Sequence, residues 1–258
     1  MAGVTYLIDG HVATITLSNP DRYNAMSLAM WTGLGDALET LRVDPHVRVV
    51  VLRGEGDRAF VSGADISEFG TQRNTKSGVA DYEAAVARAQ GALEQFPRPV
   101  IAAISGICYG GGLGLALACD LRYAATSAKF RMPAARLGLG YTLAGLHRMV
   151  AVLGTARAAE LFYTARVVNA AQAAQFGLVN ELHDDVFAHA AQVAAEIAAN
   201  APMTVAAGKL ALNTLLNGVD AAGAAAVDVA VKACFASDDY AEGRKAFAEK
   251  RTPDFKGR

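Results

Sequence analysis

The residues whose spacing most plainly suggests chemistry are three consecutive glycines, Gly110-Gly111-Gly112. They stand in the stretch RPVIAAISGICYGGGLGLALACD, from Arg98 to Asp120, between an apolar segment and an apolar helix. Peptide N–H groups at the start of such a helix can cradle a phosphate. The same geometry can present a peptide N–H to a carbonyl oxygen that gains charge during a reaction, which is an oxyanion hole. A third interpretation is structural, because glycines also let a helix and a strand pack closely.

The residues around the glycines disfavour the phosphate interpretation. Their spacing matches neither G-x-x-x-x-G-K-[ST] nor a dinucleotide fingerprint, and no lysine follows them. We expect the neighbouring Tyr109 to pack rather than to donate a proton. Asp120 is the only carboxylate between Pro97 and Ala159. The loop therefore has almost no acidic residue near it in sequence for acid-base work.

The elements that must position this loop alternate between strands and helices. An Asp9-Gly10 pair between two apolar segments predicts a type I′ hairpin over residues 6–17. The hydrophobic spacing predicts helices over residues 28–43, 79–96, 142–153, 155–163 and 170–176, and strands over 47–52, 100–104, 121–124, 129–132 and 178–182. Ser27 is the expected N-cap of the first helix. From Asp184 the chain is expected to be helical, with a break at Pro202. The fold class is therefore α/β, a mainly parallel body followed by helices.

Composition excludes several classes of partner. The chain has 258 residues, 53% hydrophobic and 19% charged, which is enough for a sizeable core. The formal net charge of −1 argues against nucleic acid as a partner. We found neither a leader pattern nor a membrane-spanning apolar run, so we expect a cytoplasmic protein with no membrane partner. No metal site is predicted, and cysteines without metal-ligand spacing are expected to be reduced and structural: Cys108, Cys119 and Cys234.

The composition shifts at about Ala195 toward alanine-rich helices of weak amphipathicity. We therefore divide the chain into residues 1–195, a core, and residues 196–258, a helical region. Such helices often find their burial in another subunit, and the alternative is a lid on the same core.

Five segments along nearly the whole chain match one family pattern: LSNPDRYNAM at Leu17, AFVSGADISEF at Ala59, RPVIAAISGICYGGG at Arg98, LRYAATSAKFRMP at Leu121 and AEGRKAFAEKRTPDF at Ala241. Through them the chain resembles the enoyl-CoA hydratase/isomerase, or crotonase, superfamily. The resemblance implies a crotonase-like spiral of β-β-α turns, with a C-terminal α-helical trimerisation region that assembles a homotrimer or a homohexamer (dimer of trimers). It also implies an acyl-CoA thioester as ligand and no cofactor beyond that coenzyme A moiety.

The same resemblance assigns roles to particular residues. The peptide N–H groups of Ala64 and Gly111 match the paired oxyanion donors, and Gly111 opens a helix whose positive end would add to them. Phe247 and Lys250 match positions that reach the nucleotide of a neighbouring subunit, although Lys250 could also be an exposed surface charge. The remaining matched positions along coenzyme A are Arg22, Tyr23, Ala25, Asp65, Ile66, Gly110, Pro133, Ala134 and Leu139.

Hydratases of this superfamily carry two glutamates that hold and activate water, and here the corresponding positions are Gly114 and Ala134. Neither residue can move a proton. General acid-base groups contribute about 10²–10⁴ each, so hydration of an enoyl-CoA is expected to be very slow. Residues 121–159 contain no Asp or Glu, which also removes the carboxylate bases of related isomerases.

A reaction that needs an enolate hole but no carboxylate base is decarboxylation of a malonyl-type thioester. The segment MPAARLGLGYTLAGLHRM, from Met132, is similar to bacterial methylmalonyl-CoA decarboxylases, in which the tyrosine matching Tyr141 lies beside the substrate carboxylate. Tyr141 could hold that carboxylate or be part of the pocket wall. That subgroup has a histidine where Ala64 stands and a glutamate where Gly114 stands.

Other candidates in this segment favour a structural interpretation. His147 is more often a packed or surface residue than a base, and Arg131 and Arg136 could recognise an acidic acyl group or simply be exposed. Three functions remain open. The chain could be a lyase acting on a carboxylated acyl-CoA, an enoyl-CoA hydratase or isomerase with another acid-base group, or a non-catalytic acyl-CoA binding protein.

Overall fold

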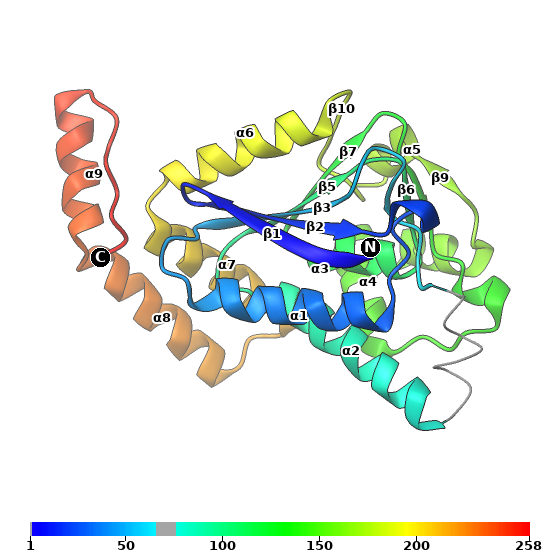
Figure 1. The fold of residues 1–258 in the computed structure, drawn as a ribbon. Helices are drawn as coiled ribbons and strands as arrows, with labels where there is room; N and C mark the ends of the chain where they lie inside the picture. Colours follow the sequence, from blue (N-terminus) through cyan, green and yellow to red (C-terminus); the bar gives the residue numbers. More distant parts are fainter. Residues whose placement is uncertain (1, 66–75) are drawn as a thin grey trace.

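The computed structural model describes residues 2–65 and 76–258, and Figure 1 shows two sheets with helices around them. The larger sheet has six strands in the order β1-β2-β3-β5-β7-β10. Their bounds are β1 Gly3–Asp9, β2 Val12–Ser18, β3 Val49–Gly54, β5 Val100–Ile104, β7 Leu121–Ala125 and β10 Glu181–His183. The smaller sheet has the order β4-β6-β8-β9, with bounds β4 Ala59–Val61, β6 Ile107–Tyr109, β8 Lys129–Arg131 and β9 Val168–Asn169.

Helices follow the strands in each turn of the chain. Their bounds are η1 Pro20–Arg22, α1 Leu28–Val43, α2 Lys76–Glu94, α3 Gly111–Ala118, η3 Ala134–Leu137, α4 Leu143–Thr164, α5 Ala170–Gln175, α6 Val186–Ala199, α7 Pro202–Asn217, α8 Ala221–Phe235 and α9 Asp238–Glu249. Two consecutive units, β3-β4-α2 and β5-β6-α3, each give one strand to each sheet and then a helix. This succession is the β-β-α spiral, so the predicted fold class is confirmed.

Successive turns of the spiral pair in the same direction within the larger sheet. Strands β2, β3, β5, β7 and β10 pair in parallel, with Val50 opposite Val100 and Ile101 opposite Leu121. Only the first hairpin of this sheet is antiparallel, and Gly10 in its turn has φ +56°, as the hairpin prediction requires. All five residues of β5 are buried, which is typical of a parallel strand covered on both faces.

Two hydrophobic clusters cover the two faces of the larger sheet. On one face, Trp31, Leu34 and Leu38 of α1 pack with residues of α2 and α3 in the main core. On the other face, Ala190 and Ala194 of α6 pack against β3, β5 and β7. Figure 1 shows α6 on one side of the strands, and α1 with α2 on the other.

Most sequence-based element predictions are confirmed. Helix α1 has the predicted bounds and cap, since the Ser27 hydroxyl accepts a hydrogen bond from the peptide N–H of Met30 at 3.2 Å. The two helices predicted over 142–163 form α4, which is interrupted at Gly154 by φ 70° and ψ 163°. The strand predicted over 178–182 was wrong at its start, because β10 begins at Glu181. The sequence analysis also missed β4, β6 and β9, which are too short for a hydrophobic period.

The C-terminal helices extend from the body. Helix α8 has no buried residue, and α8 and α9 project away from the sheets in Figure 1. The predicted boundary between residues 195 and 196 falls inside α6, and the division into two regions stays a prediction. No helix in the described part of the chain combines the length and apolar character needed to cross a bilayer.

Asp120, the isolated carboxylate of the glycine segment, has a structural role. Its Oδ2 atom accepts hydrogen bonds from Lys209 Nζ at 2.7 Å and from the peptide N–H of Val100 at 2.7 Å. Lys209 also donates to the carbonyl of Arg98 at 2.9 Å, and its side chain is only 6% exposed. This ion pair fastens α7 to the start of β5 and to the end of α3.

Removing the Lys209 ammonium should destabilise the fold. We expect Lys209→Met to lower the free energy of unfolding by about 3 kcal/mol, because Asp120 and the Arg98 carbonyl lose a largely buried partner. Urea denaturation at a fixed protein concentration measures the change. The control Lys256→Met removes an exposed pair with Asp254 and should change stability by about 0.5 kcal/mol or less. Equal unfolding midpoints for the two variants would contradict the structural role of Asp120.

Candidate active site

The glycine loop lies where β6 ends and α3 begins, directly against the end of β4. A Cβ atom at Gly112 would lie 2.3 Å from the carbonyl oxygen of Val61, so only glycine allows this contact between α3 and β4. Gly110 has φ 52° and ψ −114°, a conformation that other residues rarely adopt. The structural interpretation of these glycines therefore holds, and it does not exclude a catalytic one.

The loop after β4 carries Ala64 past the start of α3. This loop is held by an isolated parallel bridge between Met26 and Ala64. The peptide N–H of Met26 donates to the carbonyl of Gly63 at 2.8 Å, and the peptide N–H of Asp65 donates to the carbonyl of Met26 at 2.9 Å. The Cα atom of Gly63 would lie 3.9 Å from a Cβ atom at Gly110. The fold thus brings the Ala64 loop and the glycine loop side by side.

Neither predicted oxyanion donor is used by the fold. Within residues 2–65 and 76–258, the peptide N–H groups of Ala64 and Gly111 donate to no backbone or side-chain acceptor, whereas the N–H of Gly110 donates to the carbonyl of Arg131. Gly111 is the first residue of α3, where peptide N–H groups lack partners within the helix. Two free donors on adjoining loops are what an oxyanion hole requires.

The side chain of Trp31 packs against the start of α3. A Cβ atom at Gly111 would lie 3.1 Å from Cζ2 of Trp31. The Trp31 side chain is 1% exposed, and its Nε1 donates to the Tyr82 hydroxyl at 2.8 Å. The buried ring fixes the position of the start of α3.

Two neutral side chains of the described residues lie beside Gly114, the position at which hydratases carry their first glutamate. A Cβ atom at Gly114 would lie 2.5 Å from Nε2 of Gln90 and 3.8 Å from the Tyr141 hydroxyl. The Gln90 amide, which comes from α2, therefore fills the space that a longer side chain at Gly114 would occupy. Sequence reasoning missed Gln90, because only the packing of α2 on α3 brings it to the site.

Tyr141 is held in place by packing. Its ring contacts Phe162 edge to face, with centroids 5.5 Å apart, and a Cβ atom at Gly145 would lie 2.5 Å from its Cε1 atom. Burial raises the pKa of the Tyr141 hydroxyl above its ordinary value. The hydroxyl therefore stays protonated at neutral pH and can donate a hydrogen bond.

Other predicted positions lie on the next segment of chain. Ala134, at the second glutamate position, is buried at the start of η3, and the Pro133 ring would lie 3.7 Å from a Cβ atom at Gly110. Leu139 is 47% exposed. Pro133 and Ala134 thus lie by the glycine loop, and Leu139 lies outside the core.

The predicted coenzyme A residues near η1 form a second group. Arg22 forms an ion pair with Asp65 at 3.0 Å, which joins η1 to the Ala64 loop. The backbone of Tyr23 has φ 53°. The guanidinium of Arg58 lies over the Tyr23 ring, 4.3 Å from its centroid. Ala25 is buried beside them, while Ile66 lies outside the described residues.

Phe247 and Lys250 are at the end of α9, far from α3 in Figure 1. Phe247 is 87% exposed. Within one chain these two residues do not join the site, and their predicted role needs a neighbouring subunit.

The other residues considered for ligand binding or catalysis are either exposed or occupied by structural contacts. Arg131 Nε donates to the carbonyl of Ala165 at 2.7 Å, and Arg136 and His147 are exposed. Cys108 is fully buried, and burial raises the pKa of its thiol. Cys108 is therefore unsuited to act as a thiolate nucleophile.

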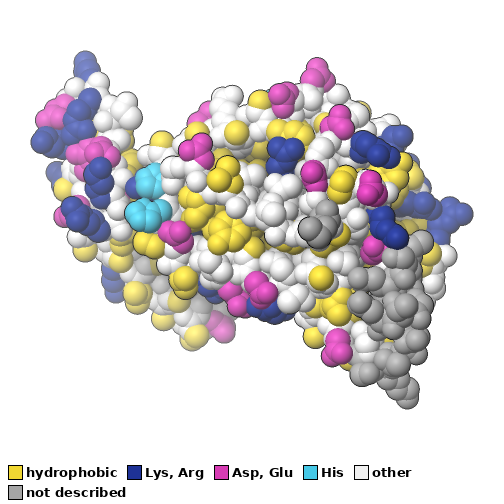
Figure 2. Space-filling model, in the orientation of Figure 1, with side chains coloured by type: hydrophobic (Ala, Val, Ile, Leu, Met, Phe, Trp, Pro, Cys, Tyr) yellow, Lys and Arg dark blue, Asp and Glu magenta, His cyan; other side chains and the backbone are white. Residues whose placement is uncertain are grey.

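A groove of about 1270 Å³ lies elsewhere on the molecule, between the β1-β2 hairpin, α6 and the C-terminal tail. Figure 2 shows the surface hollowed between the C-terminal arm and the body. None of the predicted acyl-CoA residues lines this groove.

Comparison with known proteins gives the family. The family model for enoyl-CoA hydratase/isomerase matches residues 8–258. This chain belongs to the enoyl-CoA hydratase/isomerase family. It is 33% identical to a crotonyl-CoA hydratase of Syntrophomonas wolfei, covering 95% of this chain and 94% of the relative. It is also 33% identical to a short-chain-enoyl-CoA hydratase of Clostridium acetobutylicum, covering 94% and 93%.

Solved structures agree with the family assignment. An enoyl-CoA hydratase/carnithine racemase from Magnetospirillum magneticum superposes with a TM-score of 0.91 at 37% identity, covering 100% of this chain and 97% of that one. An enoyl-CoA hydratase from Bacillus anthracis gives 0.93 at 33% identity, covering 99% of both. The chain is thus an acyl-CoA enzyme of the crotonase superfamily.

The peptide N–H of Gly111 can be removed by substitution, because proline is tolerated at the first position of a helix. We expect Gly111→Pro to lower kcat for the acyl-CoA substrate about 10²–10³-fold relative to Gly111→Ala, since only proline lacks the donor. Gly111→Ala is the matched control, because it adds the same Cβ atom beside Trp31. Equal turnover by both variants, with unchanged circular dichroism, would show that this N–H does not act in catalysis.

Proposed function

We propose that this enzyme decarboxylates a carboxylated acyl-CoA through a thioester enolate. The observation that carries the proposal is that, among the described residues, the polar groups nearest to Gly114 are the neutral side chains of Gln90 and Tyr141. Gly114 and Ala134 stand where hydratases carry glutamates. The bond from the α-carbon to the carboxylate breaks and carbon dioxide leaves. The electron pair remains on the thioester as an enolate, and the α-carbon then takes a proton from water.

The two free peptide donors suit this reaction. Negative charge develops on the thioester oxygen in the transition state, and preorganised N–H groups at Ala64 and Gly111 would stabilise it more than they stabilise the ground state. The position of Gly111 at the start of α3 adds the favourable end of the helix dipole.

Neutral side chains also suit the substrate carboxylate. Two like charges 4 Å apart repel by about 4 kcal/mol at an effective dielectric constant of 20, so a glutamate at either lost position would oppose both the carboxylate and the enolate. The Tyr141 hydroxyl and the Gln90 amide can instead donate hydrogen bonds without adding charge. Held by them, the carboxylate could lie out of the thioester plane, which aligns the breaking bond with the carbonyl π-system.

Hydration is the second candidate function, and the names of the relatives favour it. The crotonyl-CoA hydratase and the short-chain-enoyl-CoA hydratase are each 33% identical to this chain over nearly its whole length. Hydration would need an acid-base group to replace the glutamates missing at Gly114 and Ala134. Glu68, which lies outside the described residues, is a carboxylate in the sequence after Ala64. A non-catalytic acyl-CoA binding protein is the third candidate.

We further propose that the chain assembles as a homotrimer or homohexamer in the cytoplasm. Large apolar side chains on α7, α8 and α9 are exposed in the single chain: Leu212, Leu215, Val229, Phe235 and Phe247. Figure 2 shows hydrophobic side chains on the lower left of the surface. Burial of these side chains in a neighbour would also bring Phe247 and Lys250 toward another subunit's ligand.

A substrate panel distinguishes the three functions. With purified protein, we expect release of carbon dioxide from methylmalonyl-CoA, binding of a saturated acyl-CoA, and hydration of crotonyl-CoA slower by at least about 10² than decarboxylation, since both acid-base groups are missing. Coupled detection of carbon dioxide measures decarboxylation, absorbance at the enoyl band measures hydration, and calorimetry measures binding. Fast hydration without decarboxylation would overturn the proposal, and binding of all three without turnover would favour the binding protein.

Two variants sharpen this comparison. Gln90→Glu places a carboxylate beside Gly114 and should lower decarboxylation while raising hydration of crotonyl-CoA. Glu68→Gln should leave decarboxylation unchanged. Loss of a substantial wild-type hydratase activity in Glu68→Gln would instead identify that carboxylate as the replacement acid-base group.

The Tyr141 hydroxyl should act on decarboxylation more than on binding. We expect Tyr141→Phe to lower kcat for methylmalonyl-CoA about 10-fold or more with little change in the Kd of a saturated acyl-CoA, because the variant loses only the donor that orients the carboxylate. Tyr163→Phe, at an exposed tyrosine near the end of α4, is the control. Equal kcat values for Tyr141→Phe and Tyr163→Phe would make Tyr141 part of the pocket wall only.

A further inference from the structure

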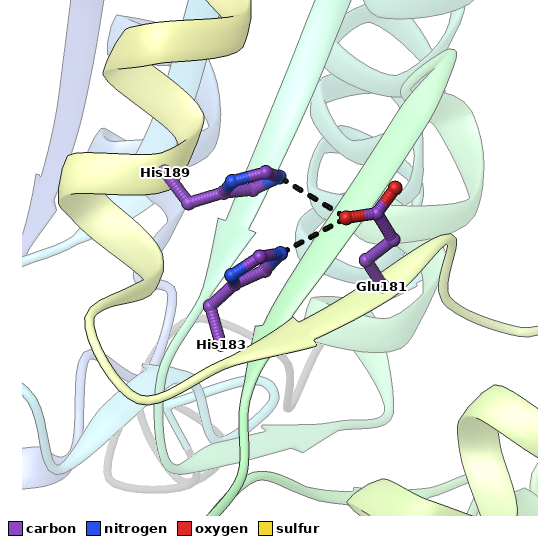
Figure 3. A group of neighbouring side chains, drawn as sticks. All are labelled: Glu181, His183 and His189. Atoms are coloured by element: carbon purple, nitrogen blue, oxygen red, sulfur yellow. Dashed lines mark hydrogen bonds and ion pairs between the residues drawn. The ribbon is translucent and has the colours of Figure 1, made fainter.

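Three potential metal ligands meet where β10 joins α6. Glu181 and His183 come from β10, and His189 comes from the first turns of α6 (Figure 3). Their ligand atoms all lie within 4.8 Å of one another. None of the three belongs to the acyl-CoA residues described above.

The two imidazoles face the same carboxylate oxygen. Nε2 of His183 lies 3.0 Å and Nε2 of His189 lies 3.6 Å from Oε2 of Glu181. The rings are stacked, with centroids 3.4 Å apart and planes 14° apart, and Figure 3 shows both nitrogens pointing at the carboxylate. Nε2 of His189 is buried, and in the described part of the chain it has no hydrogen-bond partner. A cation at this point would give that nitrogen a partner.

Neighbouring elements hold the cluster in position. Residues two apart on a strand share a face, which places Glu181 and His183 together. The Asp185 side chain caps α6 by accepting from the N–H of Ala188 at 3.0 Å, which fixes the helix start. The ring of Tyr123, on β7, contacts His189 edge to face at 4.7 Å. The start of α6 and the Tyr123 ring of β7 therefore hold His189 in position.

We propose that Glu181, His183 and His189 bind one Zn²⁺ ion. Two imidazole nitrogens and one carboxylate oxygen are ligands that zinc prefers, and a water molecule would complete a tetrahedral shell. Because the lone pairs of stacked rings are nearly parallel, the rings must tilt for both nitrogens to reach one ion. His183 is 33% exposed, which leaves its ring free to make this adjustment.

Such an ion would fasten β10, an edge strand, to α6, the helix that covers one face of the sheet. Cysteine spacing did not predict this site, because its ligands are two histidines and a glutamate from a strand and a helix. The proposed role of the ion is to join these two elements, and it does not depend on the reaction proposed for the acyl-CoA site.

Calorimetric titration of the untagged full chain with ZnCl₂ tests the site. We expect one ion per chain, and Co²⁺ should give the visible absorption of tetrahedral coordination. Zinc at about 100 times its Kd should raise the melting temperature by about 5 °C or more. His183→Ala and His189→Ala should each weaken zinc binding by more than about 100-fold. Loss of a residue that only hydrogen-bonds to a metal ligand costs about 10–100-fold in metal affinity, and loss of a ligand should cost more. His147→Ala, at an exposed histidine of α4, is the control and should bind zinc like the unchanged protein.

Absence of zinc binding by the unchanged protein would overturn the proposal, as would binding that persists in both His183→Ala and His189→Ala. Melting temperatures without metal separate loss of binding from loss of fold. Because His189 also packs on Tyr123, the His183 variant is the more direct of the two, and Glu181→Gln tests the carboxylate with the least change of shape.

Discussion

The close contact between the start of α3 and the end of β4 is the constraint on which the candidate site depends. Gly112 allows it, because any side chain there would meet the carbonyl of Val61. The contact places the glycine loop beside the Ala64 loop and leaves two peptide N–H groups without partners within the described residues. Packing and chemistry thus require the same glycines. The structural and catalytic interpretations of the glycine loop are therefore two consequences of one backbone geometry.

The charge of the surrounding side chains then limits what an oxyanion hole can do. A hole alone stabilises an enolate, whereas hydration also needs groups that deliver and remove protons. In the described part of the chain, the space at Gly114 holds the Gln90 amide and approaches the Tyr141 hydroxyl, and both are neutral. Family membership gives the acyl-CoA substrate class, and these neutral groups are why we favour decarboxylation over hydration.

Sequence reasoning predicted the parts of the structure that depend on local pattern. The hairpin at Gly10, helix α1 with its Ser27 cap, and the interruption of α4 at Gly154 follow from turn residues and hydrophobic period. The short strands β4 and β6 were missed, because three residues carry no period and their pairing is set by distant segments. The resemblance supplied Ala64, Gly111 and Tyr141 as candidates, but their roles remain proposals.

Tertiary contacts explain what the sequence could not provide. Gln90 and Gly114 belong to different helices, and only the packing of α2 on α3 joins them. The Glu181, His183 and His189 cluster likewise forms only when α6 folds back on β10.

The most direct test of the account is the carbonyl stretch of a bound thioester. Isotope-edited infrared spectroscopy of a saturated acyl-CoA, labelled with ¹³C at the thioester carbonyl, measures polarisation of that bond without turnover. Two donors at Ala64 and Gly111 predict a shift to lower frequency on binding to the unchanged enzyme, and a smaller shift with Gly111→Pro than with Gly111→Ala. A bound thioester with the carbonyl frequency of free acyl-CoA would contradict the oxyanion hole.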